Sequence, residues 1–146
     1  MGANRAIHIV TDSAIQPLSA ARAFLKLVEK EQPGLVLMGK QAIDDDANQT
    51  GQMLATLWGR PQATFAGAIT IDGEKAQVTR EVDAGLEILD IDLPAVVTVE
   101  RWPTCRATSS SVSPAVYNAV TTERRPACVP RPVGSMRVTA HWAVVP

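Results

Sequence analysis

The sequence has few cysteines, few histidines and no long apolar run, and each shortage excludes a class of function. Cys105 and Cys128 lack C-x-x-C and metal-ligand spacing, and no secretory leader pattern opens the chain, so we expect a reducing, cytosolic-type compartment. His8 and His141 lie far apart, so spacing predicts no metal centre and no catalytic pair. No apolar run approaches the roughly 20 residues of a bilayer span, so no direct membrane insertion is expected.

The average composition is that of an ordinary globular chain, but it hides a division near residue 100. With 146 residues, 46% hydrophobic and 20% charged, the chain can form one domain with a core but hardly two. Its net charge of -1 gives no indication of nucleic acid binding. Residues 1–100 carry 8 Lys+Arg against 14 Asp+Glu, whereas residues 101–146 carry 6 Arg and a single acid, Glu123.

The segment 101–146 also differs in kind from the rest of the chain. It has no Leu, Ile, Phe, Gln, Asp or Lys, yet it holds 6 of the 10 prolines and both cysteines. Its valines lack a sustained period, and the serines at 109–111 are typical of a loop. We therefore expect an α/β domain over residues 1–100, followed by a divergent and irregular tail that buries little.

Within residues 1–100 the pattern predicts strands and helices that alternate at first and then give way to a β meander. Helices are expected at 19–30, where apolar residues recur at three- and four-residue steps, and at roughly 48–58. Asp72-Gly73 is a strong hairpin signal. A strand–helix–strand unit over residues 5–38 would be parallel and right-handed. The predicted strands are residues 5–11, 35–38, 64–71, 75–82, 85–91 and 95–99.

The stretch at residues 39–51, G-K-Q-A-I-D-D-D-A-N-Q-T-G, lies between a predicted apolar strand and a predicted helix. A helix N-terminus at the carboxyl end of a strand favours an anion such as phosphate, because its first N–H groups are unpaired. Asn48, Gln49 and Thr50 would supply those N–H groups, and Gly39 would let the chain turn and a ligand approach. Neither a P-loop nor G-x-G-x-x-G is present, so an ordinary capped helix is the alternative.

Three adjacent acids, Asp44, Asp45 and Asp46, are the most conspicuous charge in this stretch. They suggest a divalent metal, but adjacent carboxylates seldom converge on one ion, and the spacing of an EF-hand is absent. The alternative is helix-start chemistry, in which the acids complement the dipole and Asp46 or Asn48 caps the helix. We therefore predict no metal ligands here.

Beyond these local signals, G-K-Q-A-I-D-D-D-A-N-Q-T-G-Q-M at residues 39–53 closely resembles the signature of the electron transfer flavoprotein beta subunit. The resemblance covers about residues 1–100. It implies an α/β, Rossmann-like nucleotide-binding domain of the adenine nucleotide alpha hydrolase-like type, here incomplete, with a β-hairpin or meander after the second helix. Four further segments are similar to that family in order and spacing: residues 1–8 (MGANRAIH), 61–66 (PQATFA), 80–87 (REVDAGLE) and 93–99 (LPAVVTV).

The resemblance also implies a function. The family's beta subunit binds AMP and pairs with an alpha subunit that holds most of the FAD. The heterodimer carries electrons from acyl-CoA dehydrogenases and other flavoprotein dehydrogenases to the respiratory chain, in the bacterial cytoplasm or the mitochondrial matrix. Such a subunit is an electron carrier without catalytic residues of its own.

The same resemblance assigns residues to the AMP site. Asn48, Gln49 and Thr50 would face the phosphate, and the backbone around Ala42 and Asp45 would line the adenine. The residues that correspond to the whole site are Gly39, Lys40, Gln41, Ala42, Ile43, Asp44, Asp45, Asp46, Ala47, Asn48, Gln49 and Thr50.

Two departures from the family pattern shape the expectations. Met1 resembles an internal methionine of the family, so an N-terminal truncation or a late start is expected. After Glu100 the family has a partner-recognition loop, of which Arg106-Ala107-Thr108 is only a faint echo, and we hypothesise a frameshift near residue 100. The alternatives are a stand-alone adenine-nucleotide-binding module and a nonfunctional gene remnant.

Overall fold

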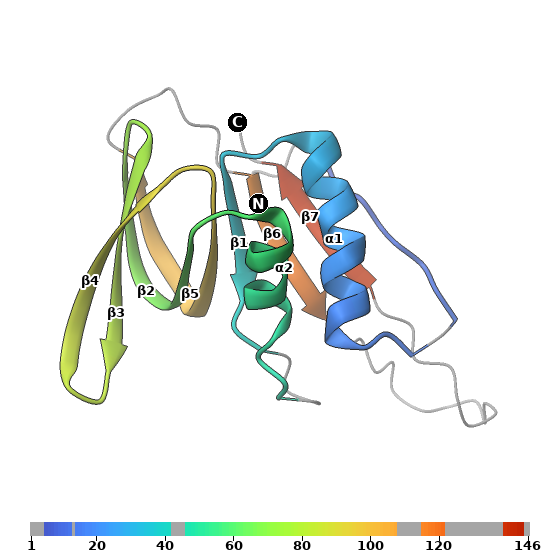
Figure 1. Cartoon of the computed structure of the whole chain (residues 1–146), viewed down its shortest axis with the longest axis horizontal. Coiled ribbons are helices and arrows are strands. Elements are labelled where there is room, and N and C mark those ends of the chain that lie inside the picture. The colour runs from blue at the N-terminus through green and yellow to red at the C-terminus, as the bar shows by residue number, and fades with distance from the viewer. Residues whose placement is uncertain (1–4, 13, 42–45, 108–114, 122–138, 145–146) are drawn as a thin grey trace.

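A computed structural model describes residues 5–12, 14–41, 46–107, 115–121 and 139–144, and from residue 101 onward it describes the backbone alone. Within this part of the chain, two helices lie on one side of a sheet with the order β4-β3-β2-β5-β1-β6-β7 (Figure 1). This arrangement confirms the predicted Rossmann-like α/β class. The elements are α1 (Pro17–Glu31), β1 (Leu35–Gly39), α2 (Thr50–Trp58), β2 (Gln62–Asp72), β3 (Lys75–Val82), β4 (Gly85–Asp92), β5 (Ala95–Ala107), β6 (Ala115–Thr121) and β7 (Thr139–Val144).

Helix α1 forms where the apolar stripe predicts it, with its start two residues earlier than expected. Pro17 occupies the first turn, where a missing N–H costs no hydrogen bond. Phe24 and Val28 belong to the apolar stripe and are buried in the core. Gln32 ends the helix in the left-handed conformation (φ 48°), and its N–H donates to the Val28 carbonyl at 2.9 Å.

Residues 5–11, predicted as a strand, form no strand in the structure. The reason is that β1 is already paired on both sides, with β5 and with β6, so the segment has no free strand edge to join there. Ile7 instead packs against the core beneath α1, and Arg5 forms an ion pair with Glu31 at the end of that helix. The predicted strand–helix–strand unit over residues 5–38 is therefore wrong, and the unit present is β1–α2–β2.

The central strand β1 and residues 95–99 of its neighbour β5 are covered on both faces. Because successive side chains of a strand point to opposite faces, Val36 and Met38 pack with the helices, whereas Leu35 and Leu37 pack on the other face. That second face is covered by side chains of β2, β3 and β4, which belong to the same apolar cluster. Continuous burial of this kind is expected of interior parallel strands, and it confirms the prediction for residues 35–38 and 95–99.

The meander β2–β3–β4 confirms the strands predicted at residues 64–71, 75–82 and 85–91. It rejoins the main sheet because β2 runs parallel to β5. Asp72 pairs with Lys75, so the hairpin loop is Gly73-Glu74, one residue later than the predicted turn. Gly73 lies in the left-handed region, with φ 58°, where a side chain is disfavoured.

Substituting Gly73 with alanine is expected to lower the free energy of unfolding by about 1–2 kcal/mol, the cost of a left-handed alanine. The cost is one of backbone conformation, because a Cβ at Gly73 would meet no atom of the described residues within 4 Å. Gly67 in β2 is the matched control, since its φ is not positive and its added Cβ would make an ordinary contact at 3.7 Å. Equal denaturation midpoints for G73A and G67A would contradict this prediction.

The expectation that residues 101–146 are irregular is wrong for the parts that the structure describes. Strand β5 continues to Ala107, β6 pairs in parallel with β1, and β7 pairs antiparallel with β6. The sequence of β6, A-V-Y-N-A-V-T, is rich in β-branched and aromatic residues, and β6 occupies the side of β1 opposite β5. The frameshift and the domain boundary stay predictions.

Candidate functional site

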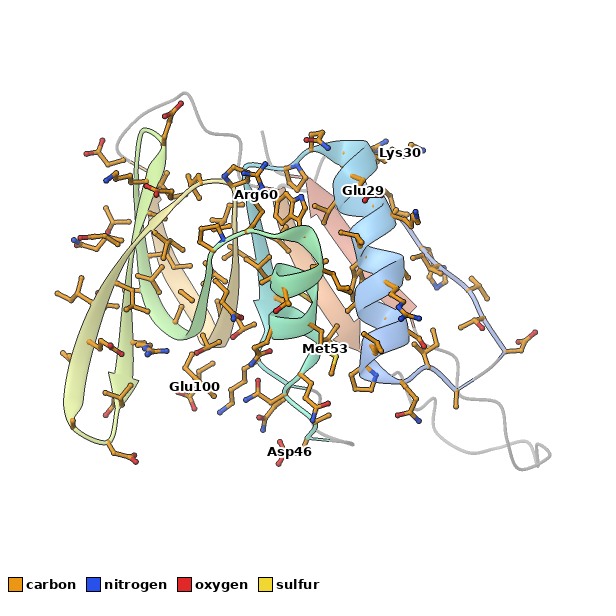
Figure 2. All side chains as sticks on the ribbon, in the orientation of Figure 1. Glu29, Lys30, Asp46, Met53, Arg60 and Glu100 are labelled. Atoms are coloured by element: carbon orange, nitrogen blue, oxygen red, sulfur yellow. The ribbon has the colours of Figure 1, made fainter. Side chains whose placement is uncertain are left out.

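The two ends of the loop predicted from sequence at residues 39–51 lie at the carboxyl ends of the central parallel strands. Gly39 ends β1 and pairs with Val99 on β5, while α2 begins at Thr50 and leads back across the sheet. Figure 2 shows Asp46 and Glu100 at this same end of the molecule, opposite Arg60. Ligands of open α/β sheets bind outside the carboxyl ends of the strands, so the loop has the position of a binding site.

The structure describes eight of the twelve predicted site residues. Ala42, Ile43, Asp44 and Asp45 lie outside the described residues. Gly39, Lys40 and Gln41 leave β1 on one side of the loop, and Asp46, Ala47, Asn48, Gln49 and Thr50 lead into α2 on the other. The loop therefore connects a central strand to a helix start, as the sequence predicted.

The predicted caps of α2 are wrong. The N-cap residue is Gln49, which makes no side-chain capping bond. Asp46 and Asn48 both adopt positive φ, 51° and 47°, and the Oδ1 atom of Asn48 accepts a hydrogen bond from Nε2 of Gln52 at 3.3 Å. Asn48 is thus engaged by a side chain one turn later and does not cap the backbone.

The first turn of α2 presents backbone donors toward the loop. The bond from the Met53 N–H to the Gln49 carbonyl, at 3.0 Å, closes that turn. The N–H groups of Thr50, Gly51 and Gln52 precede it, and the first N–H groups of a helix have no partner within the helix. The unpaired N–H groups therefore begin about two residues later than predicted. Thr50 is the one donor common to the predicted and the observed first turn.

Gly51 allows α2 to approach β5 more closely than any other residue would. A Cβ at Gly51 would lie 2.4 Å from Cγ2 of Thr98, far inside ordinary contact. Thr98 is 2% exposed, and its Oγ1 accepts a hydrogen bond from the Phe65 N–H at 3.4 Å. The helix start is therefore fixed against β5 by a direct backbone-to-methyl contact.

Lys40 joins the end of β1 to β5 and β2. Its N–H donates to the Val99 carbonyl at 2.9 Å, and its Nζ lies 2.7 Å from Oε1 of Glu100. The same ammonium group lies 5.4 Å from the centre of the Phe65 ring, within the range of a cation–π contact. Phe65 adopts φ 59° beside the register shift in β2, so the strand bends where the ring meets Lys40.

One acceptor beside the loop lacks a partner. Oε1 of Gln52 is buried and is the one buried side-chain oxygen or nitrogen without a hydrogen bond in the described part of the chain. Its Nε2 is already committed as a donor to Asn48. An unpaired buried carbonyl costs about 1–3 kcal/mol, so a ligand hydroxyl or amine would gain a well-placed acceptor here.

Gly39 meets no steric need within the part of the chain that the structure describes. A Cβ at Gly39 would meet no described atom within 4 Å, and its φ is not in the left-handed region. That Gly39 lets the chain turn and a ligand approach stays a prediction.

The described residues hold neither a side-chain cluster of the kind that binds a metal nor a helix suited to a membrane. Among them, no three His, Cys, Asp or Glu side chains come together as a metal site would require. Neither α1 nor α2 has the length and apolar character needed to cross a bilayer.

These features define a Rossmann-like α/β protein, with the loop between β1 and α2 at the carboxyl edge of the sheet. The chain belongs to the electron transfer flavoprotein domain family, whose model matches residues 1–122. It is 56% identical over 102 residues to the mitochondrial electron transfer flavoprotein subunit beta of Arabidopsis thaliana, matching 68% of this chain and 41% of that one.

Two further relatives give the same picture. The human electron transfer flavoprotein subunit beta is 54% identical over 104 residues, which cover 68% of this chain and 41% of the human one. The Bradyrhizobium diazoefficiens subunit is 51% identical over 100 residues, which cover 68% and 40% of the two chains. The chain thus matches about two fifths of the length of these relatives, and the resemblance stated from sequence is confirmed.

Sequence reasoning missed several residues that shape the site. Thr98 is a polar residue inside an apolar strand, which was the only local signal of its role. Glu100 and Phe65 gave no signal at all, because their partners are distant in the chain.

Proposed function

We propose that this chain acts as an electron transfer flavoprotein beta subunit that binds AMP in the loop at residues 39–50. The observation that carries the proposal is the identity of 51–56% to beta subunits from plant, human and bacterial sources, together with a family match over residues 1–122 that includes this loop. The position of the loop at the carboxyl edge of the sheet supports it independently.

Three features of the loop suit an adenine nucleotide monophosphate. The first-turn N–H groups of α2 and the helix dipole favour a phosphate. No described atom fills the space where a Cβ of Gly39 would lie, and the buried Oε1 of Gln52 can accept from a ribose hydroxyl or an adenine amine. AMP supplies a compact anion and a flat base and no redox chemistry, so the role of these residues is to bind and orient it.

The electron-carrying part of the proposal depends on partners. An alpha subunit would hold most of the FAD, which supplies the redox chemistry, and the pair would take electrons from acyl-CoA and other flavoprotein dehydrogenases. No catalytic residue is assigned to this chain. Bacterial and mitochondrial relatives support a location in the bacterial cytoplasm or the mitochondrial matrix.

Titration of the purified chain with AMP in a calorimeter tests the binding site. We expect saturable heat and a rise in melting temperature, because a ligand that binds only the folded state stabilises it. An absence of both would favour the alternative of a nonfunctional remnant. Co-purification with the cognate alpha subunit then separates a beta subunit from a stand-alone nucleotide-binding module.

The variant G39V is expected to lose AMP affinity by at least about tenfold, or about 1.4 kcal/mol, while unfolding as the original does. The valine side chain would fill the space that the ligand needs, and its Cβ would meet no atom of the described residues within 4 Å. G67V is the matched control, a strand glycine in β2 away from the loop. Unchanged AMP affinity in G39V would argue against this placement of the ligand.

A further inference from the structure

We propose that Lys40 is a positioning residue of the AMP site, whose ammonium group fixes the end of β1 through Glu100 and Phe65 instead of binding the phosphate. This inference rests on the proposed AMP site and adds the charged pair that sets its geometry. It assigns Glu100, a residue outside the predicted loop, a part in ligand binding that acts through Lys40.

The contacts of Lys40 with other described residues lead to neighbouring strands. Its N–H extends the β1–β5 ladder by one hydrogen bond beyond the pairing of Gly39 with Val99. Its side chain, 24% exposed, then reaches Glu100 on β5 at 2.7 Å. Main chain and side chain of one residue thus bind the same two-residue stretch of β5, so the point where the loop leaves β1 is held twice.

Phe65 brings the third strand into this contact. Its ring lies under the Lys40 ammonium group at 5.4 Å, and its N–H donates to Thr98. A left-handed phenylalanine costs free energy, and it persists only where surrounding contacts hold it. The Lys40 ammonium group therefore lies where the ends of β1 and β5 meet the bend of β2.

Both ends of the loop are consequently attached to one short stretch of β5. Lys40 fixes the start of the loop through Val99 and Glu100. Gly51, just past the other end, is fixed by its contact with Thr98. A shift of residues 98–100 would move the start of the loop and the donors of α2 together, which is why we expect the pair to affect ligand affinity.

The positioning role and direct phosphate binding by Lys40 predict effects of opposite sign on AMP affinity when the carboxylate of Glu100 is removed. If Lys40 bound the phosphate, removing the competing carboxylate of Glu100 would free the ammonium group and strengthen AMP binding. If Lys40 positions the loop, E100Q weakens AMP binding, by about two- to fivefold for a partly exposed ion pair. K40M should weaken it by a similar factor, and the double variant should be no worse than either single one.

The experiment measures AMP affinity by calorimetry for K40M, E100Q, the double variant and K40R. K40R keeps the cation and should retain more affinity than K40M. K26M is the matched control, because Lys26 forms an exposed ion pair with Glu29 on α1, away from the loop. Tighter or unchanged binding of AMP by E100Q would overturn the proposal, as would additive losses in the double variant.

A second measurement tests the positioning role without any ligand. Amide hydrogen exchange over residues 46–53 should be faster in K40M and E100Q than in K26M or the original protein. Failure of the original protein to bind AMP would overturn the proposed function but not this result. Unchanged exchange in both variants would overturn the positioning role whether or not AMP binds.

Discussion

Replacing Leu54 with alanine is expected to lower the free energy of unfolding by about 2–5 kcal/mol, as for other fully buried leucines. Leu54 is 0% exposed and lies in the core cluster that joins α2 to α1 and to the central strands. Removing its side chain leaves a cavity on the helix-covered face of the sheet. Since small domains are stable by only about 5–15 kcal/mol, this loss is a large fraction of the total.

Leu57 provides the control for Leu54 on the same helix. It is 41% exposed, so L57A should change the free energy of unfolding by no more than about 0.5 kcal/mol. Chemical denaturation of the two variants measures the difference directly. Similar midpoints for L54A and L57A would mean that α2 does not pack as the structure shows.

The same packing explains which elements could be predicted from the sequence. Helix α1 has a stripe at three- and four-residue steps, and the structure buries Ala21, Phe24 and Val28 from that stripe. Strand β1 and residues 95–99 of β5 are short apolar runs, and both are covered on two faces. In each case burial follows a local pattern, a helical period or a continuous apolar run, and such a pattern is visible in the sequence.

The errors arise where the decisive contact is distant in the chain. Residues 5–11 have the composition of a strand, but the edges of β1 are occupied by β5 and β6, which follow much later. The valine-rich β6 gave a weak signal among prolines, and only its pairing with β1 explains it. Pairing partners of this kind cannot be inferred from a window of neighbouring residues.

The candidate site divides in the same way. The strand, loop and helix start at residues 39–51 are contiguous, so their arrangement could be predicted. The pair of Lys40 with Glu100 spans 60 residues, and the bond of Phe65 with Thr98 spans 33, so neither could be. The error in predicting the cap has a local cause. The side chain of Asn48 accepts a hydrogen bond from Gln52, one turn later, and does not cap the helix.

Substituting Gly51 with alanine is expected to destabilise the protein and weaken AMP binding together. The new Cβ would lie 2.4 Å from Cγ2 of Thr98, whereas carbon atoms in contact are optimally about 3.5–4.0 Å apart. Either α2 moves away from β5 or Thr98 rotates and loses the Phe65 N–H. Overpacking of this kind costs about 1–3 kcal/mol, offset by up to about 1 kcal/mol from the helix propensity of alanine.

A compensating change in Thr98 shows whether this clash is the cause. T98S removes Cγ2 but keeps Oγ1, so the hydrogen bond from Phe65 can persist while space opens for an alanine at Gly51. The double variant G51A/T98S should therefore be more stable than the sum of the single changes predicts, with a coupling of about 1 kcal/mol or more. Denaturation of all four proteins measures that coupling, and AMP titration shows whether affinity recovers with it. If the changes in free energy of unfolding are strictly additive, the contact with Thr98 does not cause the destabilisation by G51A. Gly51 would then be needed for its backbone conformation alone.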